Sequence, residues 1–149
     1  MIAIVDRILA SGDGSGLFPP RTSDNQAFWA GLEKGAPVLQ QCDACGAFRY
    51  PIVPVCPRCS GTGFAWVSIS GRGTIFSTVV YPRSYLPEFE SLVPYVVATV
   101  ELAEGPRLFG LIRERHEAPA IGSPVVLEIE RWPDGHCVPA FRWVAGEKE

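Results

Sequence analysis

The sequence has no surplus of positive charge and no long apolar run. Its 13 lysine and arginine residues are outnumbered by 16 aspartate and glutamate residues, and the formal net charge is −3. Nucleic-acid-binding proteins usually carry a basic stripe that neutralises phosphates, so this balance disfavours that class. No stretch approaches the roughly 18 consecutive apolar residues of a membrane-spanning helix. The composition therefore predicts a globular protein for which neither nucleic acid nor a membrane is the expected partner.

A secretory leader is not expected either. Asp6 and Arg7 interrupt the apolar residues at the N-terminus, which a signal peptide would keep continuous. We therefore expect a cytoplasmic protein whose thiols stay reduced. A chain of 149 residues can hold one small metal-stapled module and one compact core of about 80–90 residues.

Four of the five cysteines form two C-x-x-C pairs within 18 residues. Cys42 and Cys45 make the first pair, and Cys56 and Cys59 make the second. Two such pairs joined by a short spacer can close around one tetrahedral metal ion. Gly46, directly after the first pair, suits a backbone position with positive φ. The pattern predicts a structural zinc site, because four thiolates leave no open position for water or substrate.

The same cysteines could instead form two disulfides or a redox C-x-x-C motif. A redox motif does not need a second copy nearby, and the expected cytoplasmic location disfavours disulfides. The zinc ribbon is therefore the preferred interpretation.

The N-terminal arm carries an apolar stripe at helical spacing, formed by Ile4, Val5, Ile8 and Leu9. A glycine-rich linker over residues 11–16 separates it from the rest of the chain. Such a short helix is marginal alone in water, so the segment is either frayed or docked on another subunit. After the linker, Ser23 and Gln26 resemble a capping box and predict a helix over residues 24–34 that ends before Gly35.

The remaining sequence favours strands. Residues 38–41 and 48–52 flank the first cysteine pair and suit the short strands of a ribbon. From Trp66 onward the apolar period is two, and five runs predict strands over residues 74–81, 95–102, 108–113, 125–132 and 140–144. Gly71 and Gly73 predict a turn or bulge at the start of the first run. Five strands in about 80 residues suggest a small closed barrel of the OB type.

The predicted fold is therefore mainly β: an N-terminal helical arm, a zinc ribbon and a five-stranded OB-fold barrel. We place the arm and helix in residues 1–35, the ribbon in 36–63 and the OB-fold domain in 64–149.

Several ordered pieces of the chain resemble a known family of two-module proteins that have a rubredoxin-like zinc ribbon and an OB-fold. The family is described as acyl-CoA-associated and was long catalogued as a domain of unknown function. The likeness runs from Phe28 to Val144. It rests on the helix at residues 28–35, the double cysteine pair with Tyr50-Pro51 between, Trp66, and residues 70–77, 94–98, 101–105, 121–122 and 141–142. Ser123 departs from the family, which commonly has a bulkier apolar residue there.

The resemblance implies a non-catalytic accessory subunit that a thiolase-fold enzyme requires for activity. That enzyme would be a thiolase or a thiolase-like aldolase acting on acyl-CoA thioesters, in lipid or steroid side-chain metabolism. The OB-fold strands and the loop over residues 81–94 are the expected partner surface, with the N-terminal arm adding to it. The thioester would pass near this interface, where Arg72 and Arg83 could meet CoA phosphates through charge-assisted hydrogen bonds. For each arginine alone, a solvent-facing position is the simpler interpretation.

Two other functions remain to be weighed. His116 suits a solvated loop, and the segment from Asp134 to Cys137 is the one cluster that suggests catalysis. His136 and Cys137 would point to opposite faces of a strand and could not share a proton there. The second alternative is an OB-fold that binds single-stranded nucleic acid through aromatic residues and a cationic groove. Phe76, Tyr81, Tyr85 and Phe109 could stack bases, but Arg113 and Arg115 are the only close basic pair after the ribbon.

Overall fold

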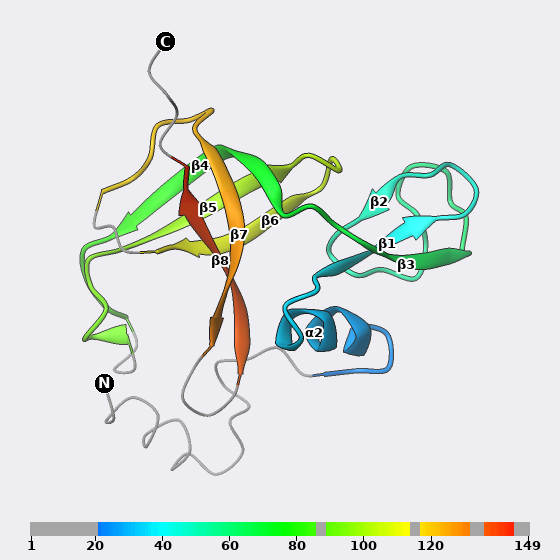
Figure 1. Ribbon diagram of the computed structural model, residues 1–149, viewed down its shortest axis with the longest axis horizontal. Coiled ribbons are helices and arrows are strands. Elements are labelled where there is room, and N and C mark those ends of the chain that lie inside the picture. Colours follow the sequence, from blue (N-terminus) through cyan, green and yellow to red (C-terminus); the bar gives the residue numbers. More distant parts are fainter. Residues whose placement is uncertain (1–20, 86–88, 114–116, 132–135, 145–149) are drawn as a thin grey trace.

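A computed structural model describes residues 21–85, 89–113, 117–131 and 136–144. The apolar stripe predicted on the N-terminal arm lies outside these residues, as do Asp134, Arg115 and His116. Within them the chain forms one helix, a small sheet and a closed barrel (Figure 1). The predicted mainly β architecture is confirmed. Among the described residues, no helix has the length and apolar character needed to cross a bilayer.

Helix α2 (Gln26–Glu33) occupies most of the predicted helical range, but its start differs from the prediction. The backbone N–H of Thr22 donates to the side-chain oxygen of Asn25 at 2.8 Å, and the Asn25 N–H donates to the Thr22 hydroxyl at 3.4 Å. These reciprocal bonds span the turn that leads into α2, one residue before the predicted Ser23–Gln26 box, and Asn25 is the N-cap residue. The predicted box is wrong because Asn25 supplies a short side-chain acceptor that Gln26 does not.

The end of α2 follows the prediction. Gly35 has φ of 70° and donates its N–H to the carbonyl of Leu32, and Ala36 donates to the carbonyl of Gly31. These two bonds satisfy carbonyls that the last helical turn leaves open. The helix therefore stops at a defined point and turns the chain into the first strand.

The ribbon sheet contains β1 (Val38–Cys42), β2 (Phe48–Arg49) and β3 (Phe64–Ser68) in the order β2-β1-β3. β1 pairs antiparallel with both neighbours, and Cys42 lies opposite Phe64. The predicted boundary at residue 63 therefore falls just before a strand that hydrogen-bonds within the ribbon sheet. β3 then leads directly into the barrel (Figure 1).

The barrel is closed by five strands in the order β4-β5-β6-β8-β7. These are β4 (Arg72–Tyr81), β5 (Tyr95–Leu102), β6 (Arg107–Ile112), β7 (Pro124–Arg131) and β8 (Cys137–Trp143). β4 closes the circle by pairing with β7, while β6 and β8 run parallel. The five predicted strand runs correspond to these five strands, so the expected OB-type barrel is confirmed.

A turn or bulge was predicted at Gly71 and Gly73: Gly71 has φ of 73° just before β4, but the bulge itself lies further along the strand. The register shifts between Ile75 and Ser77, which leaves Phe76 as the extra residue. Gly73 instead lies where β4 pairs with β5 and β7 at once, opposite Leu102 and Val125. A Cβ on Gly73 would come within 2.6 Å of the Glu101 carbonyl oxygen. Glycine is therefore needed here for close strand approach at the barrel closure, which a pattern of neighbouring glycines does not distinguish from a bulge.

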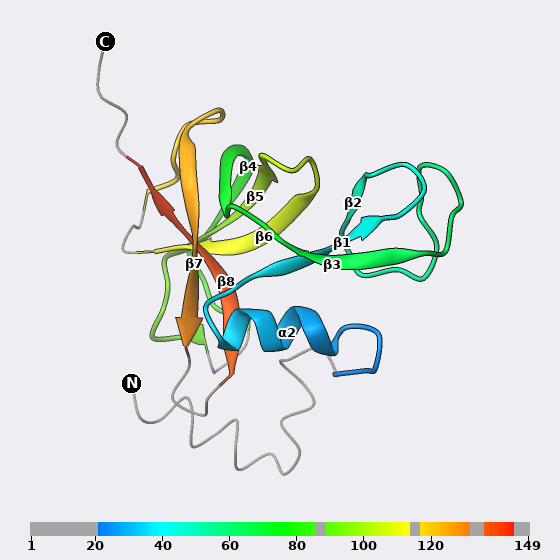
Figure 2. The same ribbon diagram turned by 45° about the vertical axis from the view of Figure 1, so that its right-hand side comes forward.

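Helix α2 joins the ribbon to the barrel. Phe28 and Leu32 are buried in one core cluster with barrel residues such as Val96 and Phe141. The helix contacts both β1 and β8, and Figure 2 shows it running beneath the ribbon strands beside β8. Arg131, the last residue of β7, donates from Nη2 to the Glu33 carbonyl at 2.9 Å. The two modules thus share a core through this helix.

Candidate metal centre and apolar barrel face

The two cysteine pairs sit on matching turns. In the first, the Gly46 N–H donates to the Cys42 carbonyl at 2.9 Å, and in the second the Ser60 N–H donates to the Cys56 carbonyl at 2.8 Å. Gly46 has φ of 73° and Ser60 has φ of 63°. The positive φ predicted at Gly46 is confirmed. Its counterpart was not predicted, because Ser60 is not a residue type that usually indicates this conformation.

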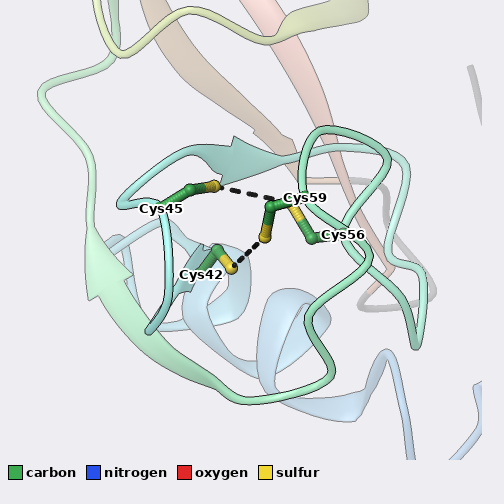
Figure 3. A group of neighbouring side chains, drawn as sticks. All are labelled: Cys42, Cys45, Cys56 and Cys59. Carbon is green, nitrogen blue, oxygen red and sulfur yellow. Dashed lines mark hydrogen bonds between the residues drawn. The ribbon is translucent and has the colours of Figure 1, made fainter.

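These turns bring the four predicted metal ligands together (Figure 3). Their sulfur atoms all lie within 4.8 Å of one another, with Cys42 Sγ 3.6 Å from Cys59 Sγ and Cys45 Sγ 3.7 Å from Cys56 Sγ. Four thiolates at about 2.3 Å from a tetrahedral zinc ion would lie about 3.8 Å apart. The cluster therefore has the dimensions of a tetrathiolate zinc site.

The surroundings favour a thiolate at Cys42. A hydrogen bond from the Cys45 backbone N–H is the largest cause that lowers the pKa of Cys42 to about 6, followed by the side chain of Arg49. The backbone N–H of Arg58 is the main cause that lowers the pKa of Cys56. At Cys59 the Gly61 N–H lowers the pKa. The neighbouring cysteines and burial together outweigh this effect and raise the pKa to about 11. Four sulfurs this close cannot all be anionic without a cation between them.

Arg49 is a buried cation beside this cluster. Its side chain is 1% exposed, and Nη2 donates to the carbonyls of Gly63 at 2.8 Å and Gly61 at 3.4 Å. Its Nε is buried without a hydrogen-bond partner, and no carboxylate of a described residue pairs with the guanidinium. The side chain of Cys42 is the largest cause that raises the pKa of Arg49. Cys42 and Cys56 are thus the negative groups that stabilise the charged form of this buried guanidinium.

The donor set and Arg49 together fit a zinc ion. Four thiolates around Zn²⁺ carry a net charge of −2, which a buried guanidinium partly offsets. Two disulfides would be neutral and would leave Arg49 buried without a counter-charge, at a cost of several kcal/mol. Zinc held by Cys42, Cys45, Cys56 and Cys59 would be enclosed by protein ligands and would have a structural role.

A second feature lies on the barrel, where the outer side of β4, β5 and β6 carries a group of apolar side chains. We define the apolar face as Phe76, Val79, Val97, Phe109 and Leu111. Val79 pairs with Val97, which pairs with Leu111, while the residues beside Val97 in sequence point into the core. Val79 is 52% exposed, Phe109 62% and Phe76 44%. The outer side of an antiparallel sheet is ordinarily polar, so this face is unusual for a surface in water.

Three arginines of the barrel are paired with glutamates. At the margin of the apolar face, Arg107 lies 3.2 Å from a carboxylate oxygen of Glu101, with its guanidinium carbon 3.5 Å from the centre of the Phe76 ring. Elsewhere Arg113 pairs with Glu128 at 3.3 Å and with Glu130 at 3.1 Å. Glu128 also accepts from Arg142 at 2.6 Å. These arginines are engaged by carboxylates and do not form a cationic groove.

The other predicted site residues are dispersed. Arg72 begins β4 and Arg83 follows its end, and both are exposed. One phosphate therefore cannot bind both arginines. Their contact with CoA phosphates stays a prediction. Cys137 is buried in the barrel core and cannot offer a thiolate to a substrate in solvent. Sequence reasoning missed Arg49 and the apolar face. The sequence did contain a signal for Arg49, which lies between Phe48 and Tyr50 just after the first cysteine pair.

Comparison with known proteins identifies both modules. Residues 29–65 match the family model "ChsH2, rubredoxin-like zinc ribbon domain", and residues 66–130 match "ChsH2, C-terminal OB-fold domain". The chain is 36% identical to a solved structure titled "Ltp2-ChsH2(DUF35) aldolase", with a TM-score of 0.71, covering 85% of this chain and 98% of that one.

Two curated relatives are named as enzyme subunits. The "Probable enoyl-CoA hydratase alpha subunit" of Thermomonospora curvata is 37% identical over 87% of this chain and 41% of its own length. The "Benzoylsuccinyl-CoA thiolase subunit BbsA" of Thauera aromatica is 30% identical over 50% of this chain and 51% of its own length. The chain thus spans about half or less of each of these relatives.

Proposed function

Because the chain belongs to the ChsH2 family, in which a rubredoxin-like zinc ribbon precedes an OB-fold domain, we propose that it is a non-catalytic accessory subunit of a thiolase-fold enzyme acting on acyl-CoA thioesters. The names of its relatives support this proposal, since they include a thiolase subunit, a hydratase subunit and an aldolase. The enzyme subunit would supply the nucleophile and the acid–base groups. The acyl group would belong to lipid or steroid side-chain metabolism, as the family resemblance implies.

The observation that carries the proposal is the apolar face. Phe76 and Val79 on β4 and Phe109 on β6 expose apolar side chains, and the Arg107–Glu101 ion pair beside them leaves little net charge. Exposed apolar patches on soluble proteins commonly mark contact with another protein. An enzyme subunit that buried this face would remove large hydrophobic side chains from water, at about 25 cal/mol per Å² of apolar area.

The ribbon has a supporting role in this proposal. A zinc ion bound by the four cysteines would hold the two turns and, through β1 and β3, the position of α2 against the barrel. The metal would take no part in the reaction, since its four thiolates leave no open coordination position. Its chemical contribution is the stability of the fold.

The alternative is an OB-fold that binds single-stranded nucleic acid, and one observation favours it. Phe109 is exposed on β6, the third barrel strand and one that OB-folds commonly use for ligands, and Phe76 is exposed on β4, so bases could stack on these rings. Against it, Arg107 and Arg113 are paired with glutamates, so phosphates would have to compete with carboxylates. We therefore rank the protein partner first.

The test mixes this protein with candidate thiolase-fold enzymes and measures co-elution and acyl-CoA turnover. Val79→Glu and Phe109→Glu should each abolish co-elution, because a carboxylate would be buried without a partner at the contact. Val55→Glu, at an exposed apolar position beside the second cysteine pair, is the matched control and should leave the complex intact.

The outcomes distinguish the accessory role itself from the assignment of the apolar face as the contact surface. If no thiolase-fold enzyme co-elutes, or if this chain alone turns over a CoA thioester, the accessory role is refuted. If a complex forms and survives both face substitutions, the role stands but the apolar face is not its contact surface.

A further inference from the structure

Arg49 holds the loop that carries the second cysteine pair. Nη1 donates to the Val53 carbonyl at 3.5 Å, while Gln40, its partner across β1 and β2, accepts from the Val53 N–H at 3.2 Å. Nη2 reaches the carbonyls of Gly61 and Gly63 on the other side of the same loop. One side chain therefore contacts the chain before and after Cys56 and Cys59. The loop cannot shift relative to β1 and β2 without breaking these bonds.

The same guanidinium needs a negative charge that no described carboxylate provides. It is almost fully buried and stacks 5.4 Å from the centre of the Phe64 ring, which shields it from water. A buried cation is tolerated when an anion lies beside it. Gly61, whose carbonyl accepts from Nη2 of Arg49, donates its own N–H to the Cys59 sulfur at 3.4 Å, so the guanidinium lies next to the residue that bonds a ligand. The described surroundings of the thiolates therefore include a buried positive charge.

We propose that Arg49 is a positioning residue of the metal centre and that its positive charge sets how tightly the four cysteines hold zinc. A zinc tetrathiolate of charge −2 becomes a unit of charge −1 when the guanidinium is included. A centre of lower net charge is easier to keep in a partly apolar setting and holds its thiolates in the anionic state. Removal of the charge should therefore weaken zinc binding even where the loop keeps its shape.

The experiment compares three substitutions in the full chain: Arg49→Gln, which removes the charge; Arg49→Lys, which keeps it; and Arg58→Gln. Arg58 lies between Cys56 and Cys59 but is exposed, so its substitution is a control for the same charge change nearby. Zinc affinity is measured by competition with a chromophoric chelator, and far-UV circular dichroism reports whether each variant is folded. Cobalt(II) replaces zinc in a parallel set, because its sulfur-to-metal charge-transfer band reports on the thiolates.

Arg49→Gln should lose about 10–100-fold in zinc affinity, the usual effect of removing a group that orients metal ligands. Its cobalt charge-transfer band should move to longer wavelength, because the sulfur lone pairs lose a stabilising positive charge. Arg49→Lys should lose less than about tenfold and keep the band near its original position, and Arg58→Gln should match the unsubstituted protein.

The proposal is overturned if Arg49→Gln retains full zinc affinity. It is also overturned if Arg49→Lys loses as much affinity as Arg49→Gln, because the hydrogen bonds of Arg49 to carbonyls, and not its charge, would then account for the effect. If Arg49→Gln does not fold, the lysine variant decides: a loss of more than about tenfold, or a band at longer wavelength, refutes the role of the charge. A failure of the unsubstituted protein to bind zinc would refute it as well.

Discussion

At the scale of single residues, the four cysteines of the metal centre have different surroundings. Cys42 and Cys56 are buried, whereas Cys45 and Cys59 are exposed. Solvent can therefore reach the centre from the side of Cys45 and Cys59, and chelators should act there first. The buried pair lies against the sheet and helps to position β1 and the second turn.

Substitution of Cys56 by serine should release zinc and loosen the ribbon. Cys56 Sγ lies 3.7 Å from Cys45 Sγ, and a hydroxyl in its place is a poor ligand for zinc at neutral pH. Elemental analysis should find one zinc per unsubstituted chain and less than one in Cys56→Ser. In Cys137→Ser the zinc content should stay unchanged, because Cys137 lies in the barrel core. Iron, or no metal in freshly reduced unsubstituted protein, would contradict the zinc assignment.

The cysteine ligands could be predicted from sequence, but Arg49 could not. Two C-x-x-C pairs specify a metal site through spacing alone, since each pair spans one tight turn. The role of Arg49 depends on where β2 places its side chain relative to carbonyls of Gly61 and Gly63, twelve or more residues away. Local residue patterns contain no information about such a contact.

At the scale of elements, α2 is the piece that connects the two modules. Its buried side contacts β1 of the ribbon and β8 of the barrel. Trp29 and Phe28 pack edge to face with ring centres 5.1 Å apart, and Phe28 also contacts Tyr50. The helix is only eight residues long and would not be stable alone. Its stability therefore comes from the two surfaces that it joins.

Leu32→Ala should destabilise the whole chain rather than the helix alone. Leu32 is fully buried in the shared core, and truncation of such a side chain typically lowers the free energy of unfolding by about 2–5 kcal/mol. Urea denaturation followed by tryptophan fluorescence measures the change. Lys34→Ala, two residues on and exposed, should change stability by less than about 0.5 kcal/mol. Equal effects of the two substitutions would show that α2 does not join the modules.

The strands were easier to predict than the details of their ends. Alternation of apolar residues identified all five barrel strands, because each has one side in the core. Competition between hydrogen bonds decides three details: the position of the bulge at Phe76, the pairing of β3 with β1, and the turn at Thr22 and Asn25 before α2. Such competition is decided by the assembled structure and not by residue type alone.

At the scale of the whole molecule, the balance of charge predicts weak binding to single-stranded DNA or RNA at physiological salt. The net charge is −3, and Arg107, Arg113 and Arg142 are paired with glutamates. Fluorescence anisotropy with labelled oligonucleotides at several salt concentrations measures the affinity and its salt dependence. Submicromolar binding that weakens steeply with salt would contradict the ranking, because that slope reports release of counterions from phosphates.

The order in which the strands pair has a consequence for synthesis on the ribosome. The ribbon sheet is complete once Ser68 has emerged, whereas the barrel closes only through β7 and β8, which end at Trp143. Nascent chains can therefore capture zinc while the barrel strands are still being made. During that interval α2 has its ribbon contact but lacks β8. A shortage of zinc in the cell would thus impair folding of the ribbon during translation, before the apolar face has formed.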